Sequence, residues 1–125
     1  VTLGGVCGTA REAVKQLRHE GLKVGLLKLR LVRPVPVDAL RRHLTGAAKV
    51  AVIDRNLSPG LGGVICQEVR AALQGLPGAP PVHGFIAGIG GVNIGVEDVM
   101  AIARQSLTAV EPNPYGIWYQ RGQNT

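Results

Sequence analysis

Hydrophobic positions along the chain change their spacing at intervals, and each change separates a helix-like segment from a strand-like one. In the first helix-like segment, Thr9 and Glu12 predict an N-terminal capping box and Gly21 predicts the C-terminal end. Between them the apolar and the basic side chains fall on opposite faces, with Ala10, Ala13, Val14 and Leu17 on one and Arg11, Lys15 and Arg18 on the other. This pattern predicts an amphipathic helix.

The other segments predict a strand–helix order that repeats about four times. Strands are predicted over residues 1–6, 27–31, 50–53 and 82–87, and further helices over 37–45, 64–73 and 96–107. Leucines alternate with Lys28 and Arg30 in the second strand, which is the period of a strand with one wetter face. Right-handed crossovers would place each helix against a mainly parallel sheet, so the predicted fold class is α/β with three α/β/α layers.

The length of 125 residues predicts one hydrophobic core rather than two. We expect an α/β domain over residues 1–109 and a C-terminal tail over 110–125, where two prolines and three of the four aromatic residues occur. The tail is expected to pack on the domain or on a partner. Val1 already lies in a predicted strand, so the simplest interpretation is an N-terminally truncated fragment of a longer chain.

Composition narrows the classes of partner. The net charge of +6 is the difference between 14 Lys and Arg residues and 8 Asp and Glu residues. The basic residues are spread along the chain and only four aromatic residues accompany them, so a nucleic-acid partner is disfavoured. No apolar run is long enough to span a membrane. Cys7 and Cys66 are too few to hold an iron–sulfur cluster or a four-ligand zinc ion, and we interpret them as reduced thiols of a cytoplasmic protein.

Three glycine-rich turns, "GGVCGT", "SPGLGG" and "GIGG", each lie between a predicted strand and a predicted helix. Such turns hold phosphates in many α/β proteins, yet none of the three has the spacing of a dinucleotide fingerprint or a P-loop. Glycine for a tight turn and for close helix–strand packing is the alternative interpretation. Polar residues that end the central strand could bind a ligand, contact a partner, pair together or cap the next helix. The candidates for an interface or an anion loop are Asp54, Arg55, Asn56, Ser58, Gly60, Gly62 and Gly63.

No arrangement of residues in the sequence predicts a catalytic centre. The histidines His19, His43 and His83 have no metal-ligand spacing, and a nucleophile elbow is absent from the sequence. Cys66 lies on the predicted inner face of its helix and is interpreted as a core residue. We therefore assign no catalytic residue and no metal ligand.

Three strings of the sequence together resemble a known family. "GTAREAVKQLRHEGLKVGLLKLRLVRPVP", "AVIDRNLSPGLGGVICQEVRAAL" and "FIAGIGGVNI…VEDV" resemble the pyruvate:ferredoxin oxidoreductases, and more broadly the 2-oxoacid:ferredoxin oxidoreductases. The match is to the transketolase C-terminal-like domain of the alpha subunit, from about Gly4 to Ile102, and "GIWYQRG" is similar to the family's ending. Two positions depart from the pattern: Val35 replaces an expected phenylalanine, and Val92-Asn93 replaces a charged pair.

The resemblance implies a five-stranded mixed sheet between helix layers, with one strand antiparallel. It also implies a parent enzyme that decarboxylates a 2-oxoacid on thiamine diphosphate with Mg²⁺, passes electrons through [4Fe-4S] clusters to ferredoxin, and uses coenzyme A as acyl acceptor. This domain would bind none of these cofactors by itself. It would be a non-catalytic assembly domain whose partners are other domains or subunits of the oxidoreductase.

Two other functions remain open from the sequence. The first is a small coenzyme- or nucleotide-binding domain that uses the glycine turns for phosphate. The second is a basic docking surface for an acidic ferredoxin. The scattered positions of the basic residues favour this function less than the assembly domain.

Overall fold

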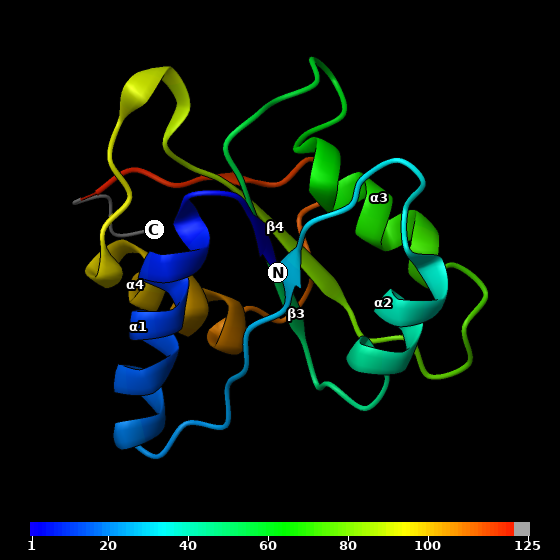
Figure 1. Ribbon diagram of the computed structural model, residues 1–125, viewed down its shortest axis with the longest axis horizontal. Coiled ribbons are helices and arrows are strands. Elements are labelled where there is room, and N and C mark those ends of the chain that lie inside the picture. The colour runs from blue at the N-terminus through cyan, green and yellow to red at the C-terminus, as the bar shows by residue number, and fades with distance from the viewer. Residues whose placement is uncertain (122–125) are drawn as a thin grey trace.

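The computed structural model describes residues 1–121, in which helices and strands alternate along the chain (Figure 1). The helices are α1 (Val6–His19), α2 (Val37–Leu44), α3 (Val64–Leu73) and α4 (Val96–Thr108), with a short 3₁₀ turn η1 (Ile89–Gly91). The strands are β1 (Thr2–Leu3), β2 (Lys28–Leu29), β3 (Val50–Asp54), β4 (Val82–Ile86) and β5 (Ile117–Trp118). The last four residues of the predicted tail, and with them the final glycine of "GIWYQRG", lie outside the described residues.

All strand pairs in the described part of the chain are parallel. β1 pairs with β2, and β3 pairs with β4 over all five residues, while β5 adds two residues to the other edge of β4. Two backbone hydrogen bonds set β1 beside β3: Val1 N donates to Ala51 O at 2.6 Å, and Ile53 N donates to Val1 O at 3.0 Å. The strands thus form two sheets, β1-β2 and β3-β4-β5, and the bonds of Val1 place them side by side in the order β2-β1-β3-β4-β5.

The expectation of a mixed sheet with one antiparallel strand is wrong for residues 1–121. A helix lies between every two consecutive strands, and such a crossover returns the chain in the same direction. The fifth strand does lie in the predicted tail, where β5 pairs parallel with β4. The division of the chain at residue 109 stays a prediction.

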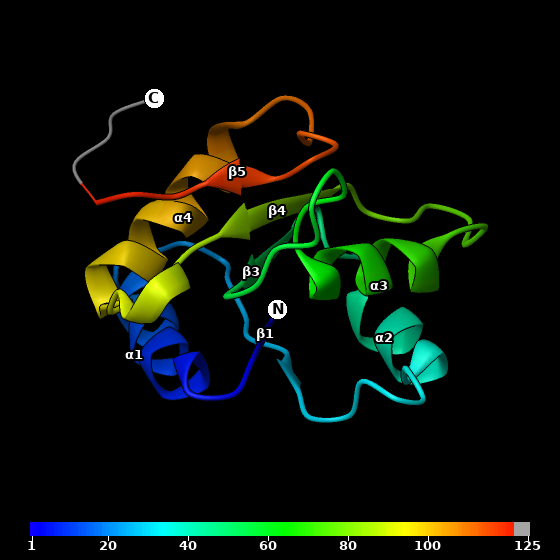
Figure 2. The same ribbon diagram turned by 90° about the horizontal axis from the view of Figure 1, so that it is seen from above.

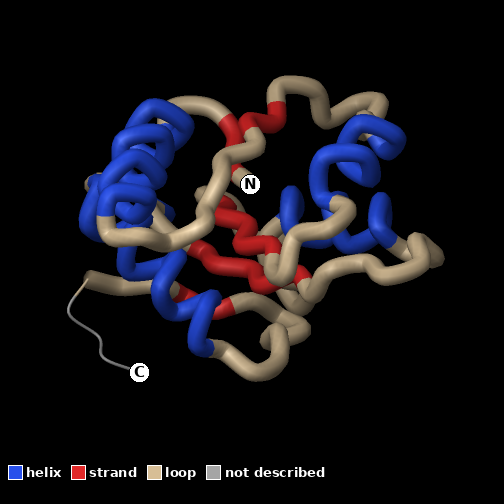
Figure 3. The backbone as a smooth tube through the Cα atoms, turned by 90° about the horizontal axis from the view of Figure 1, so that it is seen from below, coloured by secondary structure: helices blue, strands red, loops and turns tan. Residues whose placement is uncertain are grey.

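Two pairs of helices enclose the sheet as outer layers (Figures 2 and 3). On one face α1 packs against α4, and buried residues such as Ala13, Phe85 and Ile102 form a core cluster there. On the other face α2 packs against α3 over a second cluster that includes Leu40, Val52 and Val69. Cys66 belongs to this second cluster, as its sequence pattern predicted. The three-layer α/β/α architecture is confirmed.

The two ends of α1 test the predicted caps. The capping box is wrong, because the helix begins at Val6 after Gly5 and leaves Thr9 within it. The chain turns sharply at Gly4, whose φ is +74°, and the early start buries Val6 in the core. At the other end the prediction is confirmed: Gly21 has φ +91°, and N–H groups of residues 21 and 22 bond back to Arg18 O and Leu17 O as in a Schellman motif.

The strand predicted over 27–31 shortens to Lys28–Leu29. It lies at the edge of the sheet, where β1 is its one partner among the described strands. β1 is itself two residues long because α1 follows so soon. Leu29 is buried as the alternation predicts, whereas Leu31 is half exposed.

Candidate functional site

The polar residues that end β3 cap the helix that follows the glycine loop. Asp54 is 1% exposed and accepts hydrogen bonds from the backbone N–H of Ile65 at 3.0 Å and of Cys66 at 2.9 Å. Asn56 accepts one from Val64 N–H at 2.8 Å, and its amide donates to Asp54 at 3.3 Å. Three of the N–H groups that a helix leaves unpaired at its start are thereby bonded to side chains of β3 and its loop.

This cap occupies the place that an anion would need. The N-cap of α3 is a glycine and provides no side chain, so the buried carboxylate of Asp54 faces the positive end of the helix instead. Burial raises the pKa of Asp54 above its ordinary value, while the N–H groups of Cys66 and Ile65 and the amide of Asn56 oppose that shift. A phosphate at the start of α3 would have to displace both side chains.

Close packing requires two of the three glycines in the loop 57–63. A Cβ on Gly63 would lie 2.1 Å from Asp54 Oδ2, and a Cβ on Gly62, whose φ is +101°, would lie 2.5 Å from Tyr115 O. Gly60 also has positive φ, +76°, but a Cβ there would meet nothing within 4 Å. The loop closes on itself through Ser58 N–H, which donates to Gly62 O at 2.8 Å. "SPGLGG" is therefore built as a tight strand-to-helix turn.

Arg55 points away from this cap. Its side chain is exposed and reaches the loop after β4, where Nη2 donates to Gly88 O at 3.4 Å. The candidate residues thus divide into three groups: Asp54, Asn56 and Gly63 come together at the cap, Ser58, Gly60 and Gly62 form the loop, and Arg55 bridges to the next loop.

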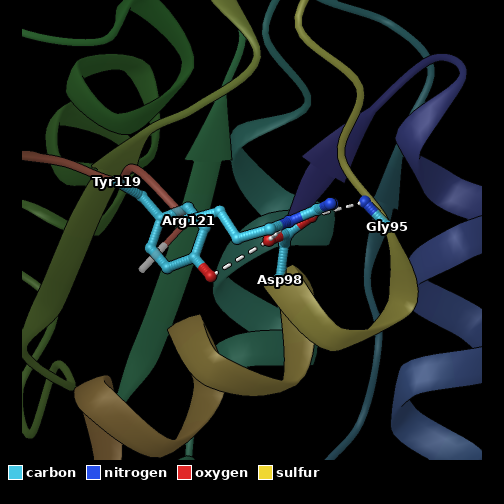
Figure 4. Close-up of polar contacts among 4 residues, drawn as sticks. All are labelled: Gly95, Asp98, Tyr119 and Arg121. Carbon is cyan, nitrogen blue, oxygen red and sulfur yellow. Dashed lines mark hydrogen bonds and ion pairs between the residues drawn. The ribbon is translucent and has the colours of Figure 1, made fainter. Parts of the chain in front are cut away.

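A second polar cluster, which the sequence analysis missed, joins α4 to the end of the described chain (Figure 4). Asp98 is 3% exposed and accepts hydrogen bonds through both oxygens. Arg121 donates from Nε at 3.1 Å and from Nη2 at 2.6 Å, Tyr119 OH donates at 3.1 Å, and Gly95 N–H donates at 2.7 Å. The guanidinium of Arg121 thus bonds both carboxylate oxygens of Asp98, and this bidentate pair holds the tail against the first turn of α4.

The ionisable groups in this cluster shift one another's pKa values. The hydrogen bond from Arg121 is the largest cause that lowers the pKa of Asp98 to about 2, against the opposing effect of burial. Burial and the Asp98 carboxylate raise the pKa of Tyr119, and the same carboxylate raises the pKa of Arg121. In the sequence, the string "GVED" gives the one indication of this cluster, an acidic residue in the first turn of a predicted helix. Tyr119 and Arg121, which bond to it, lie more than 20 residues away.

We expect Asp98→Asn to make the chain less stable near neutral pH and to matter less in acid. The folded pKa of about 2 lies below the ordinary 3.8, so the ion pair stabilises the fold above pH 4 and is lost as pH falls towards 2. Because Arg121 is largely exposed, the stability gap at pH 7 should be about 1 to 2 kcal/mol after allowing for screening. Urea unfolding between pH 7 and pH 3 measures the gap.

Asp38→Asn, on the exposed start of α2, provides the control for that series. A stability gap for Asp98→Asn that stays constant from pH 7 to pH 3 would contradict the assignment of the ion pair.

Apolar side chains are exposed on the same edge of the sheet as the cap. The loops after β3 and β4 project on one side of the molecule (Figure 1), and they carry Leu57, Leu61 and Val92, which are 40%, 50% and 62% exposed. Trp118 of β5, 51% exposed, lines a cavity of about 210 Å³ together with Val92. We call Arg55 and these four apolar residues the carboxyl-edge surface.

The three histidines, considered as catalytic or metal-binding groups, lie on three different elements of the described chain. His19 and His43 are exposed on their helices, whereas His83 is buried on β4, where its Nε2 has no hydrogen-bond partner in the part of the chain that the structure describes. Burial is the main cause that lowers the pKa of His83. Within residues 1–121 no three His, Cys, Asp or Glu side chains gather as metal ligands would, and no helix is both long and apolar enough to cross a membrane.

The family model and the individual relatives that match this chain agree with each other. The family described as "Pyruvate:ferredoxin oxidoreductase core domain II" matches residues 1–99. The chain is 39% identical to pyruvate synthase subunit PorA of Methanothermobacter thermautotrophicus, over 85% of this chain and 27% of that protein. It is 36% identical to ketoisovalerate oxidoreductase subunit VorA of Pyrococcus furiosus, over 94% of this chain and 30% of that protein. The chain therefore spans between a quarter and a third of these relatives.

Proposed function

This chain belongs to the pyruvate:ferredoxin oxidoreductase family, and from that premise we propose that it is a structural and assembly domain of such an enzyme. The parent enzyme would convert a 2-oxoacid, coenzyme A and oxidised ferredoxin into acyl-CoA, CO₂ and reduced ferredoxin. Its partners would be other domains or subunits of the same oxidoreductase, with ferredoxin as electron acceptor of the whole. The names of the two relatives, each a subunit of a 2-oxoacid oxidoreductase, support this proposal.

The cofactors of the parent fit poorly on this domain. A [4Fe-4S] cluster takes four thiolates, and the chain has two cysteines, of which Cys66 is buried in the core. The start of α3 is filled by Asp54 and Asn56 and offers no free N–H cradle to a diphosphate. We therefore place thiamine diphosphate, Mg²⁺, the clusters and the coenzyme A site in other parts of the parent enzyme. A cytoplasmic location belongs to the proposal and is supported by the two free thiols.

The composition of the carboxyl-edge surface carries the proposal. At this edge the carboxylates of Asp54 and Asp98 are bonded within the domain, whereas Leu57, Leu61, Val92 and Trp118 stay exposed. Apolar residues together with tryptophan and arginine are typical of a protein interface. The same bonding weakens the coenzyme-binding alternative, because the helix start that would hold a phosphate is already capped.

The test of the proposal is Arg55→Ala in the full oxidoreductase. Arg55 is exposed and makes one long hydrogen bond among residues 1–121, so its loss should change the free energy of unfolding by less than about 0.5 kcal/mol. Loss of an interface arginine should weaken association about tenfold, or about 1.4 kcal/mol. Analytical ultracentrifugation of the complex measures the association.

Arg42→Ala is the matched control, since Arg42 is an exposed arginine on α2, outside the carboxyl-edge surface. Association that is as tight in Arg55→Ala as in Arg42→Ala would remove Arg55 from the interface. Loss of fold stability in step with association would point to a structural role instead.

A further inference from the structure

The cavity of about 210 Å³ on the carboxyl-edge surface lies between β5 and the loop that follows β4. Its apolar wall residues include Val92, Ile94 and Trp118. Val92 and Trp118 are 62% and 51% exposed, so a molecule that covers this edge can reach the cavity from outside. The volume is below the roughly 300 to 1,000 Å³ of most small-molecule sites. A cavity of this size and lining suits an aliphatic side chain of a protein partner.

The charged residues in the walls of this cavity are already paired. Asp98 and Arg121 both line it, and two hydrogen bonds join them (Figure 4). Asp98 also accepts hydrogen bonds from Tyr119 OH and Gly95 N–H. Among the described residues, the walls of the cavity therefore carry no net charge.

The guanidinium of Arg55 lies at the rim of the cavity, against Gly88. Nη2 donates to Gly88 O at 3.4 Å, and a Cβ on Gly88 would lie 3.1 Å from Arg55 Nε. Gly88 is itself a wall residue of the cavity. Within residues 1–121 Arg55 forms no ion pair, whereas Arg121 pairs with Asp98. The rim thus carries a positive charge that the described part of the chain leaves without a carboxylate.

In the loops that directly follow the described strands, every charged residue is an arginine. These exposed residues are, in chain order, Arg30, Arg33, Arg55 and Arg121. Acidic side chains near this edge belong to the first turns of helices, as Glu97 does in α4. A partner that covers the loops would meet arginines between apolar side chains. Carboxylates between aliphatic side chains are the complement of such a surface.

We propose that the cavity and Arg55 together bind an acidic and aliphatic segment of another domain or subunit of the parent enzyme. An aliphatic side chain of that segment enters the cavity, and a neighbouring Asp or Glu pairs with the Arg55 guanidinium. A carboxylate accepts two parallel hydrogen bonds from a guanidinium, and exclusion of water by the filled cavity strengthens the pair. The inference rests on the assembly function proposed above and adds the chemistry of the partner.

Other occupants fit these features less well. A second copy of this chain that docked through the same edge would bring the same arginines towards Arg55, and like charges repel. A nucleotide would need a larger cavity, and its phosphates would find the nearby start of α3 already capped by Asp54 and Asn56.

Carbodiimide crosslinking of the full oxidoreductase tests the proposed ion pair. The reagent joins an amine to a carboxylate that touches it, and Arg55→Lys places an amine at the rim while it keeps the charge. We expect mass spectrometry to find the peptide with position 55 joined to an Asp or Glu that lies close to an aliphatic residue in another domain or subunit. Arg42→Lys, on the exposed side of α2, should give no crosslink to that peptide.

Val92→Trp tests the cavity separately. Because Val92 is 62% exposed, the larger side chain would cover the opening of the cavity without entering the core. We expect the association of the full complex to weaken about tenfold in analytical ultracentrifugation, with Tm unchanged. Val110→Trp is the control, since Val110 is 92% exposed and does not line the cavity.

Three results would each overturn this inference: no crosslink from Arg55→Lys, a crosslink only within the same chain or to a second copy, or equal association of Val92→Trp and Val110→Trp. If Arg55→Ala still weakens association in any of these cases, the assembly proposal stands and the partner's chemistry is wrong. If Arg55→Ala leaves association unchanged, Arg55 lies outside the interface and both proposals lose their common support.

Discussion

Gly63→Ala is expected to destabilise this domain far more than Gly60→Ala, although both glycines lie in the loop 57–63. The added Cβ would lie 2.1 Å from Asp54 Oδ2 and 2.5 Å from Asp54 Cγ, in a site where the carboxylate is buried. Asp54 could move only by giving up its bonds to Ile65 and Cys66. Overpacking costs about 1 to 3 kcal/mol, and leaving buried N–H groups unbonded adds about 1 to 3 kcal/mol. We expect a total loss of about 3 to 5 kcal/mol in urea unfolding.

Gly60→Ala separates this packing effect from backbone strain. Gly60 has φ +76°, so alanine there is strained by about 1 to 2 kcal/mol, but its Cβ meets no atom within 4 Å. Equal losses for the two variants would show that the contact with Asp54 is unimportant. A loss of 3 kcal/mol or more is a large part of the 5 to 15 kcal/mol that stabilises most domains.

Arg70→Met is expected to release the described part of the tail from the sheet. Arg70 on α3 donates three hydrogen bonds to backbone carbonyls, to Val82 O and Pro114 O at 2.9 Å and to Asn113 O at 3.0 Å. These bonds join α3, the start of β4 and the segment before β5. Methionine keeps the apolar stem but provides no donor, so we expect a loss of about 2 to 3 kcal/mol.

Hydrogen exchange reports the position of that effect. Tyr119 N–H donates to Ile86 O at 2.9 Å, so its exchange should accelerate in Arg70→Met while amides of α1 change little. Arg104→Met is the control, since Arg104 pairs with Glu20 and both side chains are nearly half exposed, which predicts a loss under about 0.5 kcal/mol. Unchanged protection of Tyr119 in Arg70→Met would refute the anchoring role.

Local patterns predicted the buried elements well. The bounds of α3 match the prediction because its apolar residues recur at helical spacing and a glycine turn precedes them. β3 and β4 were each predicted within one residue, since short apolar runs between turns are typical of buried strands. The capping box at Thr9 failed because a buried Val6 and the turn at Gly4 start α1 earlier.

Interactions between distant residues account for what the sequence could not predict. The sequence left several interpretations open for Asp54 and Asn56, and capping of the next helix was one of them. The choice depends on where the end of β3 lies relative to the first turn of α3. The cluster of Asp98, Tyr119 and Arg121 has no local signal in its tail residues, because β5 must first pair with β4 to bring them to α4. The interface role of the candidate residues between Asp54 and Gly63 stays a prediction.

The cap that Asp54 and Asn56 form at the start of α3 has a consequence for the order of folding. Since the acceptors for Val64, Ile65 and Cys66 come from Asp54 and Asn56, the first turn of α3 gains its hydrogen bonds only after the end of β3 is in place. A ten-residue helix is marginal in water by itself. β3, the glycine loop and α3 should therefore open and close as one cooperative unit, with closely similar opening free energies in native-state hydrogen exchange.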